Sequence, residues 1–409
     1  MSSTRMADVA DSLTPTSVVT PAAETDCELT VVIPCLNEAE TLGNCITKAL
    51  RALKEHEIHG EVVVGDNGST DGSVSIAEEV GARVVDVTPK GYGNALMGGI
   101  GVARGRYIIM GDADDSYDFL EIPRFLAALR SGYDLVQGCR LPSGGGRVLP
   151  GAMKFTHRWI GNPFFSRLAR IFFGAPVHDI YCGMRGFTKS LYQRLDMRCT
   201  GMEFATEMII KASLFQEKIA EVPITLHPDG RKTQRSHLRT FRDGWRTLRF
   251  FMCFSPKWLF LLPGLGLIGL GLLGYLVAMP GLTVFGAMLD AHTLLIASLA
   301  LILGYQCVQF AIFAKTFAIN EGLLPTDSAM ERFYHIFRLE RGLLTGFMLT
   351  VAGGVLIIVA VNMWRLAHFG NLNYAHTMRL VIPGVTSVVI GFQTILSSFY
   401  IGILRMARK

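Results

Sequence analysis

The stretch Tyr107-Ile108-Ile109-Met110-Gly111-Asp112-Ala113-Asp114-Asp115 passes abruptly from apolar to acidic side chains. Its apolar part predicts a buried strand. Side chains of an extended chain alternate between two faces, so Asp112 and Asp114 should point one way and Ala113 the other. Two converging carboxylates repel each other unless a cation lies between them, and such hard oxygen ligands suit Mg²⁺ or Mn²⁺. A solvated acidic turn is the alternative interpretation of this short motif.

Around this stretch, strand-like and helix-like segments alternate, which is typical of βαβ units with a mostly parallel sheet. Ligands of such sheets bind at the carboxyl ends of the strands. Polar turns at Asn37, Asp66 and Asp112 follow three of these ends, so the sequence predicts one site where they meet. The expected strands are 29–34, 61–65, 83–87 and 106–110, and the expected helices are 41–54, 73–80 and 94–103.

Composition divides the 409-residue chain near Pro256. The part before it alternates charged and apolar segments, as a soluble α/β domain does, whereas long apolar blocks dominate after it. Residues 1–27, rich in Ser, Thr, Ala and Pro, are predicted to be a disordered tail. The eight cysteines show no metal-ligand spacing and are expected to be reduced and buried. Four segments reach the length of about 20 residues that a bilayer requires, namely 259–279, 292–314, 344–364 and 380–404.

The distribution of basic residues predicts the orientation of these spans. The loop between the second and third spans and the chain end are rich in Lys and Arg, whereas the loop 280–291 contains neither. Basic loops stay on the cytoplasmic side. We therefore expect an integral membrane protein whose soluble domain and C-terminus both lie in the cytoplasm.

Two further loops are candidates for contact with a nucleotide. Asp66 opens the turn Asp66-Asn67-Gly68-Ser69 and is placed to accept hydrogen bonds from a base or from sugar hydroxyls, although the same letters also form an ordinary turn. The glycines of Lys90-Gly91-Tyr92-Gly93-Asn94 let backbone approach a ligand closely. Lys90 either meets a diphosphate or is solvated.

Together these motifs resemble family 2 glycosyltransferases of the GT-A fold, and most closely polyprenyl-phosphate sugar synthases such as dolichol-phosphate mannose or glucose synthases. The resemblance covers roughly residues 29–249. Two departures stand out: Asn67 replaces a frequent aspartate, and a basic motif at 231–237 has glutamine and histidine where the family often has glycine and lysine. The motifs are VVIPCLNE at 31–38, DNGSTDG at 66–72, DAD at 112–114, QGCR at 137–140 and DIYCGMRGF at 179–187.

The resemblance implies inverting transfer of a hexose from a nucleotide sugar, of the UDP-glucose or GDP-mannose type, to a polyprenyl or dolichyl monophosphate, with Mg²⁺ or Mn²⁺ as cofactor. It implies a GT-A (Rossmann-like) α/β domain at 28–228, basic interface helices at 229–258 and an all-α transmembrane domain at 259–409. Asp112 and Asp114 are the expected metal ligands and catalytic residues. Expected donor contacts are Pro34, Asn37, Glu38, Asp66, Asn67, Lys90, Gly91, Ala113 and Arg140, and expected contacts of the acceptor phosphate are Arg185, Arg231 and Arg235.

The predicted acceptor reduces the need for a general base. A phosphate monoester has a second pKa of about 6 and is already largely an anion near neutrality, so it needs positioning more than deprotonation. Asp179 is the candidate acidic residue beside the acceptor, as an orienting group or a weak base; a helix cap or a partner for Arg185 are the alternatives. The tripeptide T-E-D and the motif Q-x-x-R-W, which mark processive polysaccharide synthases, are absent from the sequence.

Two segments predict contact with a membrane surface. Residues 238–252 form a helical pattern with arginines on one side and apolar residues on the neighbouring side. Residues 153–173 repeat this pattern, and Pro163 is expected to break them into two short helices; a core helix pair is the alternative interpretation. The arginines of the first segment are Arg239, Arg242, Arg246 and Arg249.

Two other functions remain open at this point. One is a glycosyltransferase that acts on a lipid hydroxyl or a growing glycan. The other is a non-catalytic flippase or scaffold for lipid-linked sugars, although the spans contain few of the intramembrane charges that mark a translocation path. The expected partners are the sugar nucleotide, the lipid acceptor and the membrane, with no nucleic acid; a homo-oligomer is possible.

Overall fold

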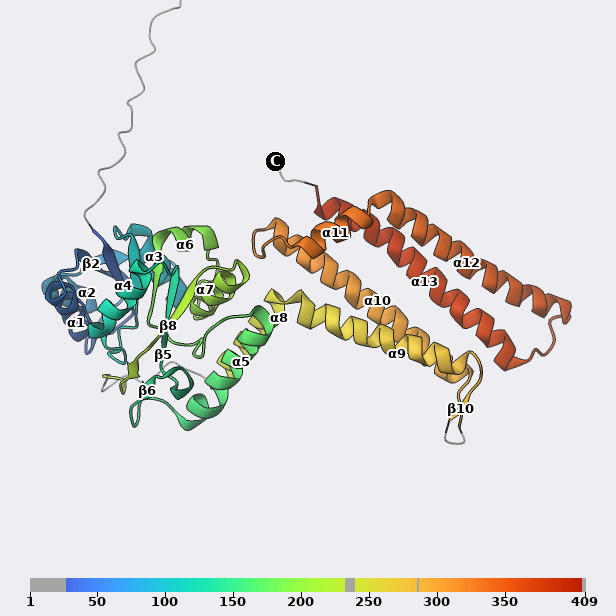
Figure 1. Ribbon diagram of the computed structural model, residues 1–409, viewed down its shortest axis with the longest axis horizontal. Coiled ribbons are helices and arrows are strands. Elements are labelled where there is room, and N and C mark those ends of the chain that lie inside the picture. The colour runs from blue at the N-terminus through green and yellow to red at the C-terminus, as the bar shows by residue number, and fades with distance from the viewer. Residues whose placement is uncertain (1–26, 232–239, 285–286, 407–409) are drawn as a thin grey trace, which may run out of the picture.

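The structure is a computed structural model that describes residues 27–231, 240–284 and 287–406. The predicted tail, except Cys27, and the predicted phosphate ligand Arg235 therefore lie outside the described residues. Figure 1 shows an α/β half followed by a half of long helices, joined through helix α8 (Thr240–Phe254). This confirms the predicted two-part architecture.

The α/β half contains a seven-stranded sheet in the order β3-β2-β1-β4-β7-β5-β8. Only β7 runs against its neighbours β4 and β5. The carboxyl ends of β1, β2, β4 and β5 therefore meet the amino end of β7 at one edge of the sheet, called the carboxyl edge below. The strands are β1 (Leu29–Cys35), β2 (Gly60–Asp66), β3 (Arg83–Asp86), β4 (Tyr107–Met110), β5 (Leu135–Cys139), β7 (Arg185–Thr188) and β8 (Ile219–Pro223).

Helices cover both faces of this sheet, which is why its strands read as continuous apolar runs. In β1, Val31 and Ile33 are buried in one core cluster and Val32 is buried in the other, as the two-residue period of a strand requires. One face is covered by α1 (Leu42–Glu55), α2 (Ser73–Val80) and α4 (Ile122–Arg130). The other is covered by α3 (Tyr92–Val102), α5 (Asn162–Phe173), α6 (Lys189–Leu195), α7 (Glu203–Leu214) and α8.

After β8 the chain returns to the acidic loop that follows β4. Strand β9 (Thr225–Leu226) pairs with β6 (Arg147–Val148) and forms a bridge to Tyr117. The backbone N–H of His227 then donates to Ser116 O (2.9 Å), and that of Gly230 donates to Asp114 O (2.9 Å). This return brings the start of the basic motif against the acidic loop.

Among the described residues, four helices of the second half are long and apolar enough to cross a membrane, and each overlaps one of the predicted spans. The hydroxyl of Tyr275 bonds Ser298 (2.6 Å) and Thr386 (3.0 Å), and so ties α9 to α10 and α13. A short helix, α11 (Ser328–Ile336), lies between the second and third spans. The long helices are α9 (Leu262–Ala278), α10 (Ala291–Asn320), α12 (Leu339–Leu366) and α13 (Tyr374–Leu404).

Candidate active site

The turns after β1 and β2 are tied together at the carboxyl edge. The backbone N–H of Asn37 donates to Ser69 Oγ (2.9 Å), and that of Glu38 donates to Ser73 Oγ (2.8 Å). Asn37 Oδ1 accepts a hydrogen bond from Thr70 N (2.8 Å). Buried Asp66 accepts hydrogen bonds from the backbone of its own turn. The structure thus brings two of the predicted donor-binding turns side by side.

Asn67 shapes the neighbouring loop. Its amide nitrogen donates to Val87 O and Pro89 O (both 2.8 Å), and its Oδ1 accepts from Gly91 N (2.7 Å). The ammonium group of Lys90 binds Asn67 O. An aspartate cannot make the two donations, so the amide at this position has a structural reason. The predicted donor contacts Asn67, Lys90 and Gly91 form one loop at the site.

Asp112 and Asp114 follow β4 as predicted, with Ala113 buried against the core between them. Tyr92 donates its hydroxyl to Asp112 Oδ1 (2.8 Å), and Ser116 donates Oγ–H to Asp114 Oδ1 (2.6 Å). Burial and the charge of Asp114 raise the pKa of Asp112 to about 6. The charge of Asp114 thus opposes ionisation of Asp112, and a cation bound between them would favour it.

Arg231 reaches this pair through the return of the chain after β8. Its guanidinium contacts Asp229 (2.7 Å), Glu38 (3.0 Å) and Asp114 (3.3 Å). Burial raises the pKa of Glu38 to about 7, although Arg231 opposes this shift. The predicted phosphate ligand is therefore a counter-charge for three carboxylates beside the candidate metal site.

Asp179 is wholly buried and holds Arg140. Arg140 Nε lies 2.7 Å from Asp179 Oδ2, and Nη2 lies 2.9 Å from Oδ1. Arg140 Nη1 donates to the hydroxyl of Tyr117 (3.2 Å), which also accepts from Gly183 N (2.8 Å). Asp179 is thus the partner of Arg140, not of Arg185, and both its carboxylate oxygens are engaged. Its role beside the acceptor stays a prediction.

Arg185 is fully buried beneath the site. Its guanidinium donates to Cys182 O (2.7 Å) and to Ala205 O, and its Nε has no partner among the described residues. Burial lowers the pKa of Arg185, yet its charge still helps to keep Asp112 ionised. Direct contact with an acceptor phosphate would require this side chain to move.

The donor atoms at Asp112 and Asp114 fit a hard divalent cation. Asp112 Oδ2 lies against Gly183, where a Cβ atom would come within 2.4 Å of it, so no larger residue fits at 183 unless this carboxylate moves. Among the described residues, no group of three or more His, Cys, Asp or Glu side chains is arranged to hold a metal. Mg²⁺ is commonly held by one or two carboxylates, with substrate phosphates and water as its other ligands.

Sequence reasoning did not identify Tyr92, Tyr117 or Asp229 as members of the site. Tyr92 stands between two glycines in a loop that the sequence singles out, which is the one local signal for it. The contacts of Tyr117 with Arg140 and Gly183 join residues far apart in the chain, and no local pattern predicts them.

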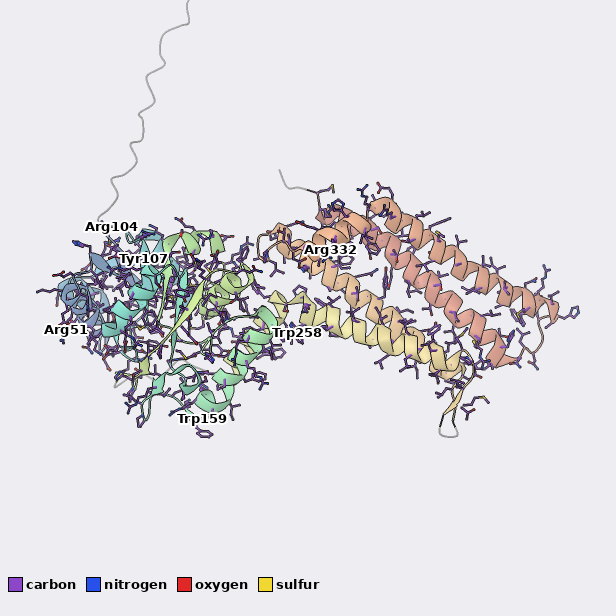
Figure 2. The ribbon with its side chains drawn as sticks, viewed as in Figure 1. Arg51, Arg104, Tyr107, Trp159, Trp258 and Arg332 are labelled. Atoms are coloured by element: carbon purple, nitrogen blue, oxygen red, sulfur yellow. The ribbon has the colours of Figure 1, made fainter. Side chains whose placement is uncertain are left out.

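The segment 153–173 carries exposed aromatic side chains. Phe155, Trp159 and Phe164 are 71%, 54% and 55% exposed, and Figure 2 shows Trp159 projecting from the edge of the α/β half. Arg158 lies over the Trp159 ring, 5.1 Å from its centroid. The expected break at Pro163 is not found: a π-helical turn, His157–Gly161, continues directly into α5, and Pro163 is the second residue of α5.

Helix α8 packs on this segment through aromatic rings. Phe251 contacts Phe165 and Phe173 edge to face, and Trp258 stacks on Phe172 with centroids 4.9 Å apart. Trp245 (60% exposed) and Arg249 lie at the surface. Arg239 is outside the described residues, as is the side chain of Arg242. The described residues of the two segments predicted to contact a membrane, 153–173 and 238–252, therefore pack together as one aromatic and basic unit.

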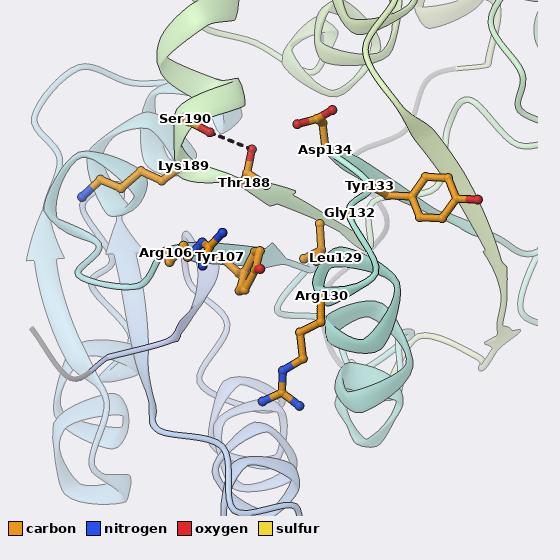
Figure 3. A pocket seen from close by; sticks show the side chains of 10 residues that line it. All are labelled: Arg106, Tyr107, Leu129, Arg130, Gly132, Tyr133, Asp134, Thr188, Lys189 and Ser190. Carbon is orange, nitrogen blue, oxygen red and sulfur yellow. Dashed lines mark hydrogen bonds between the residues drawn. The ribbon is translucent and has the colours of Figure 1, made fainter.

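A cavity of about 390 Å³ lies away from this site, lined by the start of β4, the end of β7 and the C-terminal end of α4. Figure 3 shows its basic side chains pointing away from one another. Arg130 is bound to Glu28 (2.6 Å), and Lys189 donates to Ala103 O (2.7 Å). The groups that converge are at the carboxyl edge instead.

The chain is similar to glycosyltransferases. Residues 30–196 match the model of the family "Glycosyl transferase family 2", and residues 312–405 match that of the "Glycosyltransferase family 2 C-terminal transmembrane region". The low-salt glycan biosynthesis hexosyltransferase Agl6 of Haloferax volcanii is 37% identical over 377 residues, which are 92% of this chain and 89% of the relative.

A second relative is the dolichyl-phosphate hexose transferase of Haloferax volcanii, 33% identical over 48% of this chain and 82% of its own. Among solved structures, glucosyl-3-phosphoglycerate synthase from Mycobacterium tuberculosis, in complex with Mn²⁺, uridine diphosphate and glucosyl-3-phosphoglycerate, is 22% identical. That match covers 57% of this chain and 80% of the other, with a TM-score of 0.41.

The family models and the hexosyltransferase, which aligns with almost the whole chain, confirm the predicted family and its transmembrane region. The protein is a glycosyltransferase of family 2, with a GT-A domain and a C-terminal transmembrane region.

Proposed function

We propose that this enzyme transfers a hexose, with inversion, from a nucleotide sugar to a polyprenyl monophosphate at the cytoplasmic face of a membrane. The observation that carries the proposal is the placement of Arg231. This arginine touches Asp114 of the candidate metal site (3.3 Å), and only eight residues separate it from α8, which leads into the first span. One short basic segment thus joins the candidate metal site to the helix that leads into the first span.

On the donor side, the turns at Asn37, Asp66 and Asn67 form the wall for the base and ribose. A divalent ion held by Asp112 and Asp114 would neutralise the charge that develops on the departing nucleoside diphosphate. Tyr92 orients Asp112 through its hydrogen bond, and Ser116 orients Asp114. To bind a phosphate, Arg231 would have to leave part of its contact with Glu38, Asp114 and Asp229, and a divalent ion at Asp112 and Asp114 would replace some of the positive charge withdrawn from them.

On the acceptor side, the phosphate monoester supplies its own nucleophilic oxyanion. The chain then has to position this group and exclude water. Arg140 binds both oxygens of Asp179, so this carboxylate is not free to act as a base. That is consistent with an acceptor that needs no deprotonation. The exposed Phe155, Trp159 and Phe164, with their neighbouring basic residues, suit the interface from which a lipid phosphate would enter.

The name of one relative, dolichyl-phosphate hexose transferase, supports a lipid phosphate acceptor. Transfer to a lipid hydroxyl or to a growing glycan is the alternative within the family. A non-catalytic scaffold fits less well, because it would need neither the carboxylate pair Asp112 and Asp114 nor the hydroxyl groups that bind them.

Incorporation of labelled sugar tests the proposal. Membranes that contain the protein, a radiolabelled nucleotide hexose and Mg²⁺ should yield label in an organic-extractable product that mild acid releases, since a sugar on a polyprenyl phosphate is acid-labile. Label found only in soluble oligosaccharide, or in an acid-stable lipid, would reject the phosphate acceptor.

A further inference from the structure

We propose that Glu207 of α7 is a positioning residue that fixes Asp112 through the backbone of residues 198–200 and through Tyr92. The inference rests on the proposed function and adds to it a residue that touches neither donor nor metal. Glu207 belongs to no motif of the resemblance, and it lies one layer behind the site.

Glu207 is almost completely buried, and its carboxylate binds the backbone of residues 198 and 199. Its carboxylate accepts hydrogen bonds from Arg198 N (3.1 Å) and Cys199 N (2.8 Å), and it pairs with Lys211 Nζ (2.8 Å). Lys211, also fully buried, donates to Leu195 O (2.9 Å) and to Asp196 O (2.7 Å). This buried ion pair therefore fixes the segment 195–199 at four backbone atoms.

The next residues of this segment, 199 and 200, contact the loop 90–94, called the donor-side loop below. Asn94 N donates to Thr200 O (3.2 Å). A Cβ atom at Gly91 would lie 2.4 Å from Thr200 O, and one at Gly93 would lie 2.4 Å from Cys199 O. The two backbones thus touch with no side chain between them, so a displacement of residues 199–200 must displace the loop.

Tyr92 links this loop to Asp112, so the position of the loop affects the orientation of the Asp112 carboxylate. It stands between the two glycines, and its hydroxyl donates to Asp112 Oδ1 (2.8 Å). The other oxygen of Asp112, Oδ2, lies against Gly183. Without the Glu207 charge, the two backbone N–H groups would keep only a weaker, neutral acceptor and Lys211 would lose its ionic partner, and the segment would relax.

The membrane half contacts the same segment. Arg198 donates to Glu321 O (2.8 Å), at the end of α10. The segment 195–200 therefore lies between the cytoplasmic end of a span and the loop that orients Asp112.

The test compares Glu207→Gln, Tyr92→Phe and the double variant in the full-length protein. A matched control is Glu61→Gln, since Glu61 also pairs with an arginine (Arg83, 2.8 Å) and accepts a backbone N–H (Arg104, 2.9 Å), but at the opposite edge of the sheet. We expect kcat/KM for the donor to fall about 10- to 100-fold in Glu207→Gln, as for a small misplacement of a reacting group. The double variant should lose no more than the more damaging single variant, because both act through Asp112.

A second readout is the Mg²⁺-dependent thermal stabilisation by UDP or GDP, which should weaken in Glu207→Gln and not in Glu61→Gln. Losses that multiply in the double variant, or an equal loss in Glu61→Gln, would overturn the proposal. If the wild type transfers no sugar, the proposed function fails, and the nucleotide-binding arm still decides the role of Glu207. If Glu207→Gln does not fold, Gly93→Ala replaces it, and unchanged nucleotide binding in that variant would overturn the proposal.

Discussion

Asp112 and Asp114 differ in the side chains that bind their carboxylates. Asp112 receives one hydrogen bond, from Tyr92, whereas Asp114 is held by Ser116 on one oxygen and by Arg231 on the other. A divalent ion that binds both carboxylates therefore competes with a guanidinium only at Asp114. Metal and donor binding should consequently change the surroundings of Arg231 more than those of Tyr92.

Removing either carboxylate charge should abolish transfer. For Asp112→Asn and Asp114→Asn we expect a loss of at least about 100-fold in kcat, the scale of removing one group that stabilises developing charge. Membrane insertion and expression should be unchanged. Asp134→Asn, which removes a carboxylate far from the site, is the control. Full activity in both site variants would remove the metal assignment.

Asn67→Asp restores the residue frequent in the family but should damage this protein. A carboxylate cannot donate to Val87 O and Pro89 O, and repulsion from these carbonyls should destabilise the loop by about 1–3 kcal/mol. Thermal unfolding and donor KM measure the effect. Asn94→Asp, which loses one exposed hydrogen bond to Lys90 O, is the matched control. A donor KM that falls in Asn67→Asp would show that the amide is not a structural requirement.

At the scale of elements, local sequence patterns predicted the bounds of those strands and helices that depend on neighbouring residues. The strands and helices up to β4 lie within about two residues of their predicted bounds, because apolar periodicity and turn residues mark them. The partners of Arg231 could not be predicted, since they depend on the return of residues 224–231 along a loop more than one hundred residues earlier. No local pattern predicted the ion pair between Asp179 and Arg140, the residue that follows β5, either.

The exposed aromatic side chains of the segment 153–173 should serve the lipid and not the nucleotide. The double variant Trp159→Ala/Phe164→Ala is expected to raise KM for a polyprenyl phosphate several-fold, as loss of apolar area at an interface predicts, with donor KM unchanged. Tyr133→Ala, which removes an aromatic side chain exposed elsewhere on the α/β half, should change neither constant. An increase in donor KM alone would place this unit in the donor site.

At the scale of the whole molecule, the four spans imply that the α/β half and the loop before α12 share one side of the membrane. A cysteine introduced at Ser328, at the start of α11 between the second and third spans, should resist a membrane-impermeant maleimide in intact cells, and one at Asn371, between α12 and α13, should react. The parent chain is the background control. The opposite labelling pattern would reverse the proposed orientation.

The most direct measurement uses the purified full-length protein in lipid nanodiscs with a nucleotide hexose, Mg²⁺ and either a polyprenyl monophosphate or the matching polyprenol. Mass spectrometry of the lipid fraction should show one hexose added to the monophosphate, nothing added to the polyprenol, and no product with Asp112→Asn. A hexose on the polyprenol, or on neither lipid while a glycan is extended, would contradict the proposed function.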